Sequence, residues 1–134
     1  MRANRIINGV LSASLAMLLV ATPGVAGAHC CKEVASTRLQ PVDPVATPRL
    51  RGRAVVLDCF GVISMLSVVV NSPEPDGTSY APALVGAEPI LGDFFSLTSH
   101  RGEGFILDVS AAQVQGRTVS VFDQNFGEVL TGTF

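Results

Sequence analysis

The sequence predicts an all-β domain, a small antiparallel β-sandwich or barrel-like fold, that follows a helical signal peptide. The densest apolar stretch after the leader, residues 53–71, is rich in valine and isoleucine. Such β-branched side chains lose rotamer freedom in a helix but pack well on a pleated sheet. From residue 93 to the C-terminus, short segments of alternating polarity are separated by turn residues. This spacing is typical of antiparallel strands in a sandwich or barrel.

Residues 1–28 have the pattern of a secretory signal peptide. Arg2 and Arg5 form a positive start, residues 6–20 are mostly apolar, and the small residues 26–28 provide a cleavage site. Cleavage after Ala26 and cleavage after Ala28 both fit this pattern. We therefore expect a secreted or periplasmic protein, with no stable membrane span once the leader is removed. The alternative is an uncleaved N-terminal anchor.

The mature chain is long enough for one domain with its own core. We divide it into an N-terminal arm with a proline-rich linker, residues 29–51, and a β domain, residues 52–134. The prolines at 41, 44 and 48 predict an extended, irregular connector or an edge strand.

The charge of the chain argues against nucleic-acid binding. Eleven acidic residues face nine basic ones, for a formal net charge of −2, whereas nucleic-acid-binding domains carry a basic patch. Only Arg49, Arg51 and Arg53 cluster, and because they alternate they share one face of an extended chain. We interpret them as a solvated strand end, with contact to phosphate or acidic lipid as the alternative.

Three cysteines in an exported chain predict one disulfide bond and one remaining thiol. Cys30 and Cys31 make a poor pair, because consecutive Cα atoms lie about 3.8 Å apart and disulfides need about 4.4 Å or more. Cys59 is therefore expected to pair with Cys31 or with Cys30. The remaining cysteine can stay free, link two chains into a disulfide-bonded dimer, or bind a metal.

Residues 53–71 predict two buried strands, because Gly61 divides the stretch into segments of about 53–60 and 62–71. One buried helix is an alternative, since small and polar residues recur in the stretch at helical spacing. A transmembrane helix is a third interpretation, but Asp58 interrupts the apolar run and what remains is shorter than about 20 residues.

The rest of the chain is predicted to alternate loops and strands. Residues 72–92, rich in proline and glycine, form a long loop, and residues 100–104 form a glycine-rich turn. We expect strands at 93–98, 105–110, 118–122 and 128–134, and a single helical turn within 110–116. The seven phenylalanines are predicted to belong to the core.

The candidate metal site is the mature N-terminus, with His29, Cys30 and Cys31 as ligands. If cleavage follows Ala26, the terminal amine, two backbone nitrogens and the His29 imidazole can surround copper(II) in a square plane. If cleavage follows Ala28, His29 contributes both its amine and its ring. Neighbouring thiolates suit copper(I) or zinc. The competing interpretation is a frayed terminus whose cysteine serves a disulfide.

No catalytic residue and no cofactor other than this copper or zinc ion is predicted. Ser99 and His100 are adjacent, so in an extended chain their side chains point apart. Asp58 and Asp108 lie in apolar segments, and we expect them to face solvent or an arginine, with acid–base chemistry as the alternative. We predict a non-enzymatic interaction or structural module that binds a protein partner, with copper or zinc binding as the alternative function.

Overall fold

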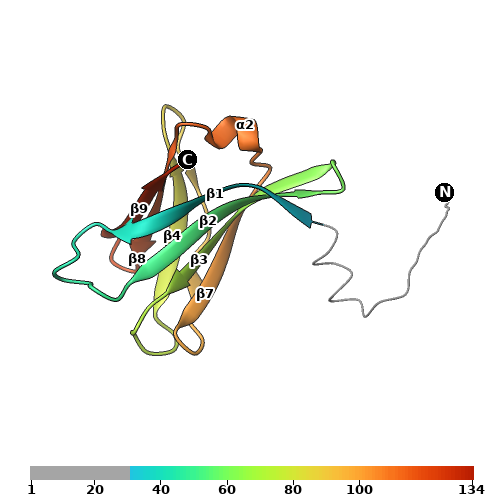
Figure 1. Cartoon of the computed structure of the whole chain (residues 1–134). Helices are drawn as coiled ribbons and strands as arrows, with labels where there is room; N and C mark the ends of the chain where they lie inside the picture. The colour runs from blue at the N-terminus through green and yellow to red at the C-terminus, as the bar shows by residue number, and fades with distance from the viewer. Residues whose placement is uncertain (1–30) are drawn as a thin grey trace, which may run out of the picture. The chain divides into compact units, whose positions relative to one another are not determined.

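The computed structural model describes residues 31–134, whose nine strands form one antiparallel sheet that closes almost completely into a barrel (Figure 1). The prediction of an all-β, barrel-like domain is confirmed. The strands are β1 (Cys31–Pro41), β2 (Arg51–Cys59), β3 (Ile63–Asn71), β4 (Ser79–Val85), β5 (Ile90–Leu91), β6 (Phe95–Ser96), β7 (Arg101–Leu107), β8 (Thr118–Asp123) and β9 (Glu128–Thr133). Their order in the sheet is β5-β4-β8-β9-β1-β2-β3-β7, and β6 pairs with β4.

The valine-rich stretch forms two strands, as predicted. β2 and β3 pair in continuous register from Arg51 opposite Asn71 to Cys59 opposite Ile63. Alternate residues of this hairpin point into the barrel and are fully buried; they are Ala54, Val56, Leu66, Val68 and Val70. The residues that alternate with them point the other way and form the outer face of the sheet.

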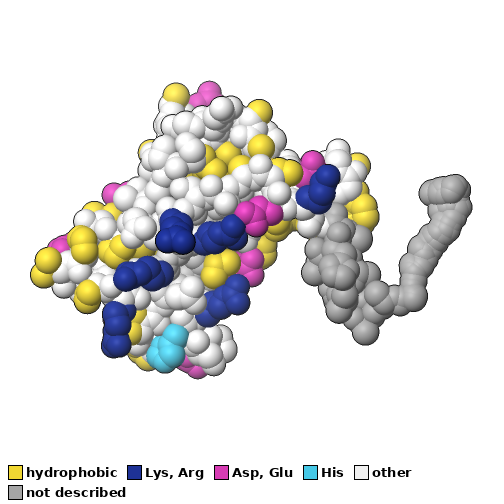
Figure 2. All heavy atoms as spheres, viewed as in Figure 1, with side chains coloured by type: hydrophobic (Ala, Val, Ile, Leu, Met, Phe, Trp, Pro, Cys, Tyr) yellow, Lys and Arg dark blue, Asp and Glu magenta, His cyan; other side chains and the backbone are white. Residues whose placement is uncertain are grey.

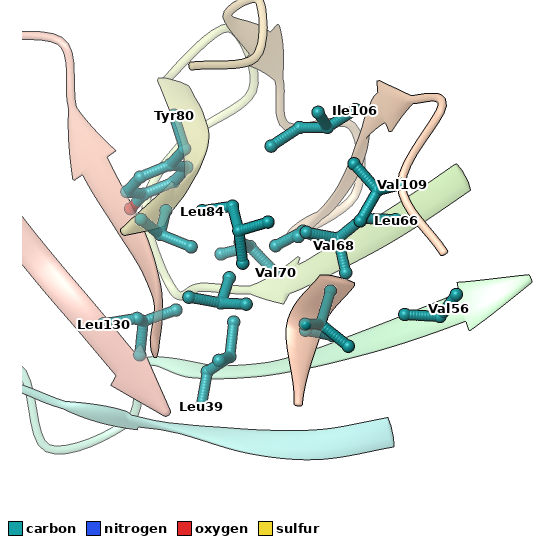
Figure 3. Close-up of a cluster of buried hydrophobic side chains, with 14 of the residues drawn as sticks. Leu39, Val56, Leu66, Val68, Val70, Tyr80, Leu84, Ile106, Val109 and Leu130 are labelled. Carbon is teal, nitrogen blue, oxygen red and sulfur yellow. The ribbon is translucent and has the colours of Figure 1, made fainter. Parts of the chain in front are cut away.

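The core is mainly aliphatic, with Tyr80 as its aromatic member, and Figure 3 shows leucine and valine side chains from several strands meeting inside the barrel. The prediction that the phenylalanines form the core is wrong for most of them, whereas Phe95 and Phe134 are partly buried and pack against it. None of the seven is fully buried, and Phe60, Phe94, Phe105 and Phe126 are 71%, 45%, 46% and 75% exposed. The interior of a small barrel is just wide enough for side chains to fill, and leucine, valine and Tyr80 already fill it.

Residues 29–51, predicted as an arm and linker, in part belong to the sheet. β1 lies between β9 and β2, and its Leu39 is buried in the core. The prolines come only where this strand ends: Pro41 is its last residue, and Pro44 and Pro48 lie in the loop that leads to β2. The strand therefore keeps its backbone donors.

The predicted long loop at 72–92 contains the strand β4, which pairs with β8 from Tyr80 opposite Asp123 to Val85 opposite Thr118. Pro82 lies inside this strand. Its carbonyl oxygen accepts a hydrogen bond from the Gly92 amide at 2.8 Å. Because the N–H and C=O of one residue point to the same side of a strand, the missing N–H of Pro82 faces away from β8 and costs no bond in that ladder.

The barrel closes where Phe95 of β6 lies against β7. A Cβ atom on Gly104 would be 2.5 Å from the Phe95 ring, and one on Gly102 would be 2.8 Å away. These glycines, predicted as turn residues, are instead inside the strand and leave space for the ring. The turn lies one step earlier, at Ser99 and His100, where the backbone φ angles are positive.

The remaining C-terminal predictions are confirmed by β8, β9 and the single-turn helix α2 (Ala111–Val114). Ser110 and Gln113 form a capping box at the start of α2. Among residues 31–134, no helix has the length and hydropathy needed to cross a membrane.

Candidate functional site

One end of the outer face of strands β2, β3 and β7 is apolar. Leu57, Met65 and Leu107 lie side by side in direct register across the three strands. Around this row lie further apolar residues of the outer face and of the hairpin turn. We call the whole set the apolar face: Leu57, Phe60, Val62, Ile63, Met65, Phe105 and Leu107. Phe60, Val62 and Leu107 are 71%, 84% and 66% exposed, and none of the seven residues is charged.

The turn at the tip of the hairpin holds Phe60 in solvent at a conformational cost. Phe60 and Gly61 have φ angles of 61° and 68°, and the Val62 amide donates to the Cys59 carbonyl oxygen at 3.2 Å. Turns with two positive φ angles prefer Asn-Gly, because other L-residues are strained there by about 1–2 kcal/mol. The Asp58 carboxylate accepts a hydrogen bond from the Gly61 amide at 2.9 Å and fixes the turn.

Exposed apolar side chains that gather in this way are typical of a contact site for another protein. A carboxyl group, that of Asp58, lines the same hollow as Val62 and Ile63. Phenylalanine is enriched at the centres of such interfaces, where a rigid ring buries a large area for little loss of side-chain entropy. The apolar face is built on three paired strands of a continuous sheet. It can therefore present its aromatic side chains in a fixed arrangement.

No known protein family, curated protein or solved structure matches the chain.

At the loop end of the barrel a cavity of about 410 Å³ opens between the β1–β2 loop, the segment after β3 and the β8–β9 turn. Tyr80 at its floor is only 4% exposed, and its hydroxyl lies 2.9 Å from Ser72 Oγ, which also accepts the Glu74 amide at 3.2 Å. Burial raises the pKa of Tyr80. The hydrogen bond with Ser72 lowers this pKa, and the carboxylates of Glu74 and Asp123 raise it further.

The hydroxyl groups of Tyr80 and Ser72 carry two hydrogens between them, and their mutual bond uses one. Within residues 31–134 no other acceptor is bonded to either hydroxyl. The second hydrogen is therefore available to a water molecule or to a ligand oxygen in the cavity.

Cys31 and Cys59 are joined in a disulfide bond, so the first of the two predicted pairings is the one observed. A disulfide of this kind fits an oxidising compartment. While it is formed, Cys31 has no thiolate to offer a metal. His29 and Cys30 lie outside the described residues, and their copper or zinc binding stays a prediction. Across residues 31–134, no three His, Cys, Asp or Glu side chains gather as a metal site would require.

The carboxylates considered for acid–base chemistry both lie beside turns. Asp58 caps the hairpin turn through its bond to Gly61, and Asp108 follows β7 with a positive φ of 60°. Ser99 and His100 are the central residues of the turn between β6 and β7, and no hydrogen bond joins their side chains. These positions give all four residues a part in shaping the ends of strands.

Sequence reasoning missed the apolar face because residues 105–109 have apolar side chains on both faces of the strand. The sequence therefore does not say which face is buried. The prediction recognised a half-buried strand there, but Ile106 is the residue that points inward, whereas Phe105 and Leu107 point outward. The available signal was the dipeptide Phe60-Gly61. A large aromatic residue placed directly before a turn glycine, between two apolar runs, is more easily explained by exposure than by burial.

Proposed function

We propose that the chain is an exported, non-enzymatic interaction module that binds a protein partner through the apolar face. The exposed position of Phe60 is the observation that supports this most directly. Its side chain is 71% exposed and adds nothing to the core, while its positive φ angle costs stability. A contact with another protein would give this side chain a role that the isolated fold does not.

Export is supported by the signal-peptide pattern of residues 1–28 and by the disulfide between Cys31 and Cys59. Mass spectrometry of the protein recovered outside the cytosol tests this directly. We expect a mature N-terminus after Ala26 or Ala28 and a mass two hydrogens below that of the reduced chain. A full-length cytosolic product with three free thiols would contradict export.

The chemistry of the apolar face defines the partner. Because the face is uncharged, we expect it to meet a hydrophobic groove or patch, and we expect the affinity to change little between low and high salt. A partner held mainly by ion pairs would show a steep loss of affinity with salt instead.

Site-specific photocrosslinking in the producing cells tests the proposal. A photoreactive amino acid at position 62, 84% exposed, is expected to trap one protein partner in a discrete band. The same probe at position 45, which is 91% exposed in the β1–β2 loop, is the matched control and should trap none. Phe60→Ser should abolish the band from position 62. If position 62 traps only a second copy of the chain, the face is a dimer contact; if the two positions behave alike, the proposal fails.

A further inference from the structure

The other end of the same outer face is basic. Arg51 of β2, Asn71 of β3 and Arg101 of β7 form one row across the three strands, in direct register. Cross-strand neighbours of this kind have Cβ atoms about 5 Å apart, so the two arginines flank the asparagine closely. Arg51 uses Nη1 to donate to the carbonyl oxygens of Pro48 and Leu50, both at 2.8 Å. Its Nη2 and Nε donors have no partner among residues 31–134.

Beside this row lies a hollow of about 550 Å³, lined by Arg49, Asn71, Ser72, Pro73, Ser99 and His100. None of these six residues is acidic. Neither the Arg49 nor the Arg101 guanidinium group has a hydrogen-bond or ion-pair partner within the described part of the chain. His100 Nδ1 lies 3.1 Å from the Glu74 carbonyl oxygen, which can only accept, so this nitrogen carries a hydrogen.

A strained turn holds His100 against the hollow. Ser99 and His100 have φ angles of 53° and 66°, the combination for which a turn prefers Asn-Gly. The Ser99 amide donates to the Asp76 carboxylate at 2.8 Å, and the Ser72 amide donates to the His100 carbonyl oxygen at 2.9 Å. These bonds fix a backbone conformation that costs energy, and such strain is concentrated at binding sites in proteins.

Three carboxylates lie near this region and keep their negative charge, but none of them lines the hollow. Asp76 accepts a hydrogen bond from the Ser99 amide, and Glu103 accepts one from Ser67 Oγ at 2.6 Å. Glu74 lines the neighbouring cavity at Tyr80, which shares Arg49, Ser72 and Pro73 with the hollow. Figure 2 shows arginine and lysine side chains gathered over one face of the molecule. The formal net charge of the whole chain is −2, so the clustering of arginines is a feature of this face and not of the whole protein.

We propose that this hollow binds an oxyanion, a phosphate or sulfate group carried on a larger molecule. The planar guanidinium group of Arg49 lines the hollow, and that of Arg101 lies in register with Asn71 at its border. Each guanidinium provides paired N–H donors that match two oxygens of such a group. The Asn71 amide adds a neutral donor between the arginines. The inference does not depend on the interaction module, because none of these residues belongs to the apolar face.

Titration of the isotope-labelled disulfide-bonded protein with inorganic phosphate, sulfate and pyrophosphate at low ionic strength tests the site by NMR. We expect the amide signals of Asn71 and His100 to shift with saturable, millimolar binding, tightest for pyrophosphate. Arg49→Gln combined with Arg101→Gln should weaken binding by about tenfold or more, since two charge-assisted contacts are lost. Arg38→Gln removes one exposed charge from β1, outside the hollow and the row, and should change binding less than about twofold.

A second set of measurements distinguishes the source of the anion. Vesicles of phosphatidylglycerol are compared with vesicles of phosphatidylcholine in a flotation assay. If the parent protein floats with the anionic vesicles and the double variant does not, the ligand is a lipid phosphate. If the parent binds only the soluble anions, the ligand is a soluble phosphate or sulfate compound. The proposal is overturned if none of the anions binds. It is also overturned if the double variant is folded, as judged by its thermal midpoint, and still binds the anions as the parent does.

Discussion

Removal of the disulfide should cost this domain a large share of its stability. The variant Cys59→Ala opens a loop of about 29 residues, from 31 through 59, that the bond closes in the unfolded chain. In the chain-entropy model a loop of this length lowers the entropy of the unfolded state by about 12 cal/mol/K, which stabilises the native state by about 3.6 kcal/mol at 25 °C. Domains of this size are stable by only about 5–15 kcal/mol.

Urea unfolding, followed by far-UV circular dichroism, measures the loss. Dividing about 3.6 kcal/mol by a slope of about 1–3 kcal/mol per molar urea predicts a midpoint lower by roughly 1–3.5 M. The thermal midpoint should fall by about 15–30 °C, given about 4–8 °C for each kcal/mol. The chain has one tyrosine and no tryptophan, so tyrosine emission gives a second probe that reports on Tyr80 alone.

Cys30→Ala is the matched control, because it removes a cysteine and leaves the bond between Cys31 and Cys59 in place. Its midpoint should equal that of the parent. The reasoning is refuted if Cys59→Ala costs less than about 1 kcal/mol while thiol titration shows that the parent bond is formed. That result would mean that the unfolded chain is already compact over residues 31–59 and gains little freedom from the cut.

Three further predictions test the fold around the proposed sites. Gly104→Val places a branched side chain against the Phe95 ring and should cost about 1–3 kcal/mol in urea unfolding, a penalty that Phe95→Ala in the same chain should reduce. The pKa of Tyr80 is raised, so the protonated phenol stabilises the fold fully below about pH 10, and this stabilisation is lost as the pH rises through the folded-state pKa. Tyr80→Phe should therefore reduce the loss of circular dichroism signal at alkaline pH. Phe60→Asn should stabilise the hairpin by about 0.5–1 kcal/mol, because asparagine tolerates the positive φ angle, and a lower thermal midpoint would contradict the assigned strain.

The strands that the sequence predicted well are those in which local and tertiary preferences agree. In β2 and β3, β-branched composition, a dividing glycine and burial on one face all favour the same hairpin. β4 was missed because Pro82 and the surrounding glycines favour a loop locally. The missing N–H of Pro82 is harmless because it faces away from β8, and this can be seen only in the assembled sheet. The sequence does not show which strands will be neighbours.

The candidate sites were less predictable for a similar reason. Arg49, Arg51 and Arg53 were recognised as one cluster, but the structure pairs Arg53 with Glu33 at 2.6 Å and adds Arg101 from a strand fifty residues away in register with Asn71. A surface that is assembled from three strands requires the register of all three. Periodicity within one strand gives the parity of a residue but not the identity of its cross-strand neighbours.

The two proposed sites share one sheet face, and this arrangement has a physical consequence. Ile63 at the apolar end and Asn71 at the basic end are the first and last residues of β3, about 27 Å apart at the rise of an extended strand. That separation exceeds the Debye length of about 8 Å at physiological salt, so an anion in the hollow should leave the affinity of the apolar face unchanged. Ligands at both ends can therefore be bound together on a single chain, and the module could hold a protein partner against a phosphate- or sulfate-bearing surface.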